Sequence, residues 1–117
     1  MVHKSNDQCF YGGLIRLHIL HHAVQEPLFG LAIIEELARH GYKLSPGTLY
    51  PLLHGLERKG YLCSTQKRSG KTARRMYRAT PLGRKVLAAA REKVSELFAE
   101  LLEDELRSQP HKQAASL

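Results

Sequence analysis

The fold is decided by residues 45–60, which read SPGTLYPLLHGLERKG. Ser45-Pro46 predicts the start of a helix, because serine is a favoured N-cap and proline suits the first helical position. The leucines that follow have the i, i+3, i+4, i+7 spacing of one buried helix face: Leu49, Leu52, Leu53 and Leu56. The opposite face carries Thr48, Tyr50 and His54 instead of the usual glutamates and lysines, so this helix is predicted to present a binding surface.

Local patterns also predict the elements on either side of this helix. Two amphipathic helices precede it, over residues 9–24 and from residue 28 or 30 to residue 40. Two strands follow, over residues 61–67 and 74–79, and the turn between them makes a hairpin with a basic tip. A second cap-then-proline pair, Thr80-Pro81, opens a long helix that reaches about residue 106. The predicted fold is mainly α with a small β-hairpin: a winged helix-turn-helix plus a long C-terminal helix.

Positive charge is concentrated in one part of the chain. The 117 residues carry a formal net charge of +7, and ten of the eighteen lysines and arginines lie between Arg58 and Lys85. The same stretch contains no aspartate or glutamate. Such a segment suits a polyanionic partner, with nucleic acid favoured over an anionic membrane. The alternative is a small helical domain whose basic loop is only solvated.

Other features exclude several classes of protein. No apolar run is long enough to span a bilayer, and residues 1–7 do not resemble a signal peptide. Cys9 and Cys63 form no disulfide framework, so we expect a cytoplasmic protein. No glycine-rich phosphate loop follows a predicted strand, and no nucleophile has an evident base, so we expect no enzyme activity and no cofactor.

The predicted order of elements suits double-stranded DNA. A helix of this size fits the major groove, and a basic hairpin can reach the neighbouring phosphates or the minor groove. We therefore expect a DNA-binding domain over residues 1–80, a dimerisation helix over residues 81–106 and a frayed tail over residues 107–117.

The sequence resembles the PadR family of transcriptional regulators over about residues 14–105. The resemblance is carried by Gly30, by LSPGTLYPLL at 44–53, by LERKGYL at 56–62 and by RRMYRATPLGR at 74–84. The single long C-terminal helix is similar to that of the short subclass, which dimerises through that helix and the first one. One departure is Phe29-Gly30-Leu31, where many members have His-Gly-Tyr; it affects local packing or ligand contacts and not the fold.

The resemblance implies a homodimeric repressor that binds a pseudo-palindromic operator. It places Ser45, Thr48 and Tyr50 at the DNA-facing start of the recognition helix. The wing residues that it implies as contacts are Lys67, Arg68, Lys71 and Arg74, and we include the adjacent Arg75. His54 has two interpretations, a contact to a base edge or a solvated side chain. Tyr77 is predicted to be a core residue.

The long helix carries an apolar stripe at heptad spacing: Leu87, Ala90, Val94, Leu97 and Leu101. A chain this short has no evident partner for the stripe, so the pattern favours pairing with a second copy. Family members also bind small aromatic molecules near the dimer interface. The corresponding pocket wall would contain Phe10, Leu14, Leu17, Val94 and Phe98, for which plain dimer core is the alternative.

Two alternatives on the same scaffold are a protein-interaction module and a metal- or redox-sensing module. Three histidines are the reason to consider a metal. His18 and His22 lie four residues apart on one helix face, with His21 beside them. Zinc needs three or four ligands, and no recognisable ligand spacing is present. The sequence therefore favours exposed or interface histidines and no metal. Cys63 is predicted to be a small hydrophobic residue of a strand rather than a redox sensor.

Overall fold

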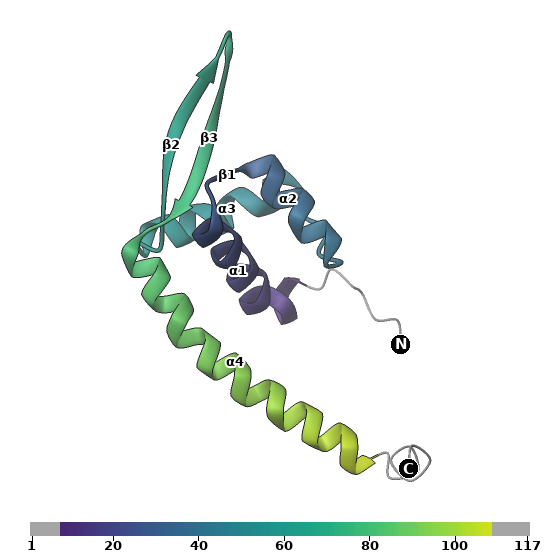
Figure 1. Ribbon diagram of the computed structural model, residues 1–117. Coiled ribbons are helices and arrows are strands. Elements are labelled where there is room, and N and C mark those ends of the chain that lie inside the picture. Colours follow the sequence, from purple (N-terminus) through teal and green to yellow (C-terminus); the bar gives the residue numbers. More distant parts are fainter. Residues whose placement is uncertain (1–7, 109–117) are drawn as a thin grey trace. The chain divides into compact units, whose positions relative to one another are not determined.

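The computed structural model describes residues 8–108 and has the predicted order of elements (Figure 1). The elements are α1 (Gln8–Gln25), β1 (Leu28–Phe29), α2 (Gly30–Arg39), α3 (Pro46–Arg58), β2 (Leu62–Ser69), β3 (Thr72–Ala79) and α4 (Pro81–Ser108). This arrangement confirms the winged helix-turn-helix with a long C-terminal helix. Residues 107 and 108 continue α4 beyond its predicted end, and residues 1–7 and 109–117 lie outside the described part of the chain. Within the described residues, no helix is both long and apolar enough to cross a membrane.

The wing is a three-stranded antiparallel sheet in the order β1-β3-β2. Strands β2 and β3 pair along their full length, from Leu62 opposite Ala79 to Ser69 opposite Thr72. The two-residue connection has Gly70 at its first position with φ +62°, the backbone that a type II′ hairpin turn requires there. Strand β1 was not predicted, because two apolar residues before a helix have no periodicity of their own.

The core lies between the inner faces of α1, α2 and α3 and the base of the hairpin. Leu49 and Leu53 of α3 and Tyr77 of β3 are completely buried. Leu52, predicted with the buried leucines, is only partly buried against them. The buried residues are Ile15, Ile19, Leu20, Ala23, Ile33, Leu37, Leu44, Leu49, Leu53, Leu56, Leu62, Tyr77, Ala79 and Leu87.

The start of α4 is fastened to the end of α3 through Thr80. The Thr80 hydroxyl accepts a hydrogen bond from the Gly83 N–H at 2.9 Å and donates one to the Gly60 carbonyl, so the predicted cap is present. A Cβ atom at Gly83 would overlap the carbonyl oxygen of Tyr61, which explains a glycine inside this helix. The chain divides into two compact units, the first ending at Leu87 and the second beginning at Ala88.

Candidate nucleic-acid interface

The first turn of α3 presents two hydroxyl groups. Ser45 occupies the predicted N-cap position, and its carbonyl accepts the Thr48 and Leu49 N–H groups at 3.0 and 2.9 Å. Its side chain makes no hydrogen bond to the helix backbone, and its Oγ donates a hydrogen bond to Thr48 Oγ1 at 3.3 Å. Ser45 is exposed and Thr48 is partly exposed, so both hydroxyls remain near the surface where phosphate oxygens can be bound.

Tyr50 connects α3 to the start of α2. Its side chain is only 36% exposed, and its hydroxyl lies so close to Gly30 that a Cβ there would overlap it. Tyr50 is exposed, as the sequence predicted, and part of its ring also packs against Gly30 of α2. The absence of a side chain at Gly30 makes this position of the ring sterically allowed. His54, one turn further along α3, is exposed.

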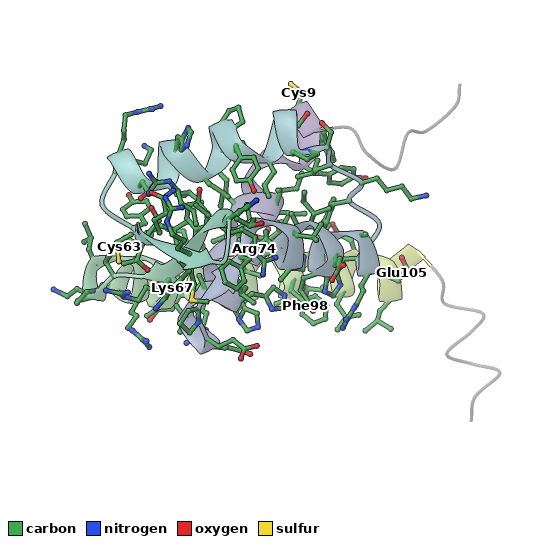
Figure 2. All side chains as sticks on the ribbon, turned by 90° about the horizontal axis from the view of Figure 1, so that it is seen from above. Cys9, Cys63, Lys67, Arg74, Phe98 and Glu105 are labelled. Carbon is green, nitrogen blue, oxygen red and sulfur yellow. The ribbon has the colours of Figure 1, made fainter. Side chains whose placement is uncertain are left out.

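The hairpin carries unpaired positive charge. Lys67 of β2 and Arg74 of β3 are direct cross-strand partners, and both are exposed (Figure 2). Like charges directly opposite each other destabilise a sheet. Arg68 and Lys71 are also exposed, and in the described part of the chain no acidic side chain pairs with any of these four cations. A polyanion bound along the hairpin would remove the repulsion.

Two arginines in the half of β3 nearer the turn contact neighbouring side chains. The Arg74 guanidinium carbon lies 4.3 Å from the ring centroid of Phe29 in β1, a cation–π contact. Arg75 donates to Ser64 Oγ at 3.1 Å, and Ser64 in turn donates to the Glu57 carboxylate at 2.6 Å. Because a guanidinium has five N–H donors, Arg75 keeps most of its donors for another partner.

A shallow cavity of about 310 Å³ lies between α2, α3 and the wing. It is lined by Phe29, Gly30, Leu31, Tyr50, Gln66, Ala73, Arg74 and Arg75. The structure therefore brings three of the predicted contact residues, Tyr50, Arg74 and Arg75, to one concave surface. The sequence analysis did not include Phe29 or Gln66 in the site. The only feature of the sequence that drew attention to Phe29 was that Phe29-Gly30-Leu31 stands where many family members have His-Gly-Tyr.

Tyr77 is a core residue, as predicted. It is fully buried, and its hydroxyl has no hydrogen-bond partner among the described residues. Burial raises the pKa of this hydroxyl above its ordinary value, and the nearby Glu57 carboxylate raises it further. Tyr77 therefore packs in the core at the base of the hairpin and is not available for contact with a ligand.

Comparison with known proteins identifies the family. Residues 19–89 match the Transcriptional regulator PadR-like family, a span that includes α2, α3, the wing and the start of α4. This chain belongs to the PadR family. It is 50% identical over 93 residues to Transcriptional regulator Rv3488 of Mycobacterium tuberculosis, across 80% of this chain and 87% of that protein. It is thus a PadR transcriptional regulator with a winged-helix DNA-binding fold and not an enzyme, as the sequence predicted.

Solved structures have the same fold. A PadR-family transcriptional regulator from Eggerthella lenta aligns with a TM-score of 0.71 and 32% identity, over 79% of this chain and 81% of that one. The conserved protein TM0937, described as a potential transcriptional factor, aligns with a TM-score of 0.77 and 25% identity, over 89% of this chain and 95% of that one. These similarities confirm the winged helix-turn-helix of this PadR-family chain.

The predicted dimer and effector residues are mostly exposed. In α1, Phe10 and Leu14 are exposed and Leu17 is partly buried against the core. In α4, the exposed apolar side chains include Val94, Leu97, Phe98 and Leu101. Leu87 was predicted to share this stripe, but it is buried in the core of the first unit because the first two turns of α4 belong to that unit. In this PadR chain the exposed stripe begins after Leu87.

Proposed function

We propose that this regulator binds a pseudo-palindromic operator as a homodimer and represses transcription there. The N-terminal turn of α3 enters the major groove, with Ser45, Thr48 and Tyr50 facing the DNA and His54 reaching toward a base edge. The hairpin follows the phosphates through Lys67, Arg68, Lys71, Arg74 and Arg75. The observation that carries this proposal is the like-charged Lys67–Arg74 pair, with which no acidic side chain of the described residues forms an ion pair.

The wing is tested by removing its charge and measuring how DNA binding depends on salt. The variant Lys67→Ala, Arg68→Ala, Lys71→Ala should fold normally, because all three side chains are exposed. Its affinity for DNA should fall, and the slope of log K against log salt should decrease in magnitude by about 0.9 for each phosphate that the variant no longer neutralises. Fluorescence anisotropy with labelled operator DNA measures both quantities.

The matched control removes the same net charge outside the proposed interface. Arg39, Arg91 and Arg107 are exposed cations of α2 and α4, so their triple alanine variant lowers the net charge equally. We expect this control to keep the salt slope of the wild-type protein. An equal decrease of the slope in both variants would mean that net charge, and not the wing, determines binding.

The homodimer is supported by the exposed apolar side chains of α4. Leu97, Phe98 and Leu101 are 53%, 63% and 59% exposed, which is unusual for large hydrophobic residues on one helix. Val94, Leu97 and Leu101 alternate at spacings of three and four residues, as the core positions of a coiled coil do. A second copy of α4 is the simplest partner, and a two-fold dimer presents two α3 helices to a symmetric operator.

Repression and symmetry are tested together by selecting genomic DNA with the purified protein. The bound fragments should share inverted half-sites about 10 base pairs apart from centre to centre. Transcription in vitro from a promoter that overlaps such a site should decrease when the protein is added. Increased transcription, or a bound motif without inverted symmetry, would contradict this part of the proposal.

A small aromatic effector is the last part of the proposal. Its support is the exposure of two aromatic rings, Phe10 at 77% and Phe98 at 63%, together with the exposed Leu14 and Val94 and the partly buried Leu17. Titrating a panel of small aromatic acids and amines into the protein–operator complex should reveal at least one that releases the DNA. Phe98→Ala should weaken that response. An unchanged response in this variant would favour the alternative that these residues are dimer core only.

A further inference from the structure

Three histidine side chains converge between α1 and the end of α2. His18 and His22 are one turn apart on α1, and His40 caps the C-terminus of α2. One nitrogen of each ring lies within 4.8 Å of a nitrogen of the other two. The His18 and His40 rings are stacked with their centroids 4.5 Å apart. The packing of α1 against α2 therefore assembles a group that is scattered over 23 residues of sequence.

One buried nitrogen of this cluster lacks a hydrogen-bond partner among the described residues. His22 Nε2 is buried and has no hydrogen bond among the described residues. Its nearest charged neighbour is Glu36, whose Oε2 lies 3.8 Å away, beyond hydrogen-bond distance. Buried polar atoms are normally satisfied, and an exception in a folded protein calls for an explanation such as a bound ion.

We propose that His18, His22 and His40 form a binding site for one divalent transition-metal ion of the zinc class. Three imidazole nitrogens are a common ligand set for such ions, whereas calcium and magnesium prefer oxygen ligands. A tetrahedral site with Zn–N distances of about 2.0–2.1 Å requires ligand nitrogens about 3.3 Å apart. The ligand nitrogens need to approach by at most about 1.5 Å, and the stacked His18 and His40 rings need to rotate so that their lone pairs converge. The exposed His40 can move most easily.

The surroundings of the cluster favour the ligand form of the rings. Burial lowers the pKa of His18 and His22, and the neighbouring histidines lower both further, whereas the Glu36 carboxylate acts in the opposite direction on His22. The other titratable groups facing the cluster are His21 on α1, Glu36 and Arg39 on α2, and Tyr42 after it. A neutral imidazole offers a lone pair to a metal without first losing a proton.

Glu36 lies on the ligand side of His22. A carboxylate there can hydrogen-bond the water that completes a three-histidine zinc site, from outside the coordination sphere. Its carboxylate lies beside His22 Nε2 and also pairs with Arg39 at 3.5 Å. Three protein ligands leave a fourth tetrahedral position for water.

The sequence did not predict this site because its third ligand is distant along the chain. Along the sequence, His18, His21 and His22 show no recognisable zinc-ligand spacing. His40 lies eighteen residues beyond His22, and only the packing of α2 on α1 brings the two together.

The site is tested by titrating the full chain with Zn²⁺ and following heat release, with Co²⁺ as a spectroscopic probe. The wild-type protein should bind one ion per chain with micromolar or tighter affinity. Co²⁺ should produce the visible d–d absorption of a tetrahedral complex. Zn²⁺ should also raise the melting temperature, because a ligand that binds only the folded state stabilises it.

His40→Ala is the decisive variant, because His40 is exposed and its removal should leave the fold intact. We expect it to weaken Zn²⁺ binding by at least about 100-fold and to abolish the increase in melting temperature. The loss of a ligand should have a large effect, because even mutating an outer-sphere partner typically lowers metal affinity by about 10- to 100-fold. His21→Ala is the matched control: His21 is adjacent in sequence, faces Gln25 at 3.0 Å and is not a proposed ligand. Glu36→Gln should weaken binding less than His40→Ala.

Three results would overturn the assignment. One is a wild-type chain that binds no Zn²⁺ at micromolar concentration. Another is His40→Ala binding as tightly as the wild type, which would indicate other ligands such as Cys9, an exposed thiol. The third is an equal decrease of affinity in His21→Ala and His40→Ala. None of these measurements requires DNA, so they are independent of the proposed regulatory function.

Discussion

Gly83→Ala should destabilise the winged-helix unit although alanine is the better helix former. Replacing a helical glycine with alanine ordinarily stabilises a helix by up to about 1 kcal/mol. At Gly83 the new Cβ would overlap the carbonyl oxygen of Tyr61, which is backbone and cannot rotate away. Such overpacking costs about 1–3 kcal/mol. The required movement also disturbs the hydrogen bond from the Gly83 N–H to Thr80 Oγ1, a cap that contributes about 1 kcal/mol.

These contributions sum to a net decrease of about 2 kcal/mol in the free energy of unfolding. For a domain of this size that decrease lowers the melting temperature by about 8–16 °C. Urea unfolding followed by circular dichroism measures the change. Gly13→Ala is the matched control, because Gly13 is also helical and a Cβ there meets nothing within 4 Å. A Gly83→Ala variant as stable as the wild type, alongside a stabilised Gly13→Ala, would refute the steric argument.

Three further predictions concern the DNA interface and the dimer. Tyr50→Ala should cost only about 1–2 kcal/mol in stability, because the ring is partly exposed, and should reduce operator affinity measured by anisotropy. Gly30→Ala should reduce operator affinity in the wild type, because its Cβ would displace the tyrosine hydroxyl. In the Tyr50→Ala background the same substitution should cause little further loss of affinity. Additive losses in this double-mutant cycle would contradict the proposed contact. Leu97→Asp should give monomers in sedimentation experiments and weaken operator binding, because it places two carboxylates in one symmetric interface. Ala99→Asp adds the same charge at another exposed position of α4 and should leave the dimer intact; a dimeric Leu97→Asp variant would exclude α4 as the interface.

Local signals in the sequence were sufficient to predict most of the secondary structure. The Ser45-Pro46 and Thr80-Pro81 pairs mark where α3 and α4 begin, and the leucine spacing of α3 predicts its buried face. These signals act within one or two turns of the chain, so they do not depend on what packs against them. The basic segment around the hairpin was likewise visible as a run of cations without acids.

The sequence by itself determined the order of elements, the class of fold and the family, because caps, periodicity and charge are properties of short segments. Only the tertiary structure decided which distant residues meet. It pairs Arg74 with Phe29 through the short strand β1, seats the Tyr50 hydroxyl against Gly30, and places His40 beside His18. It also assigns Leu87 to the core rather than to the exposed stripe of α4. The physical reason is that periodicity shows which face of an element is buried but does not identify the side chains on the neighbouring element that cover it.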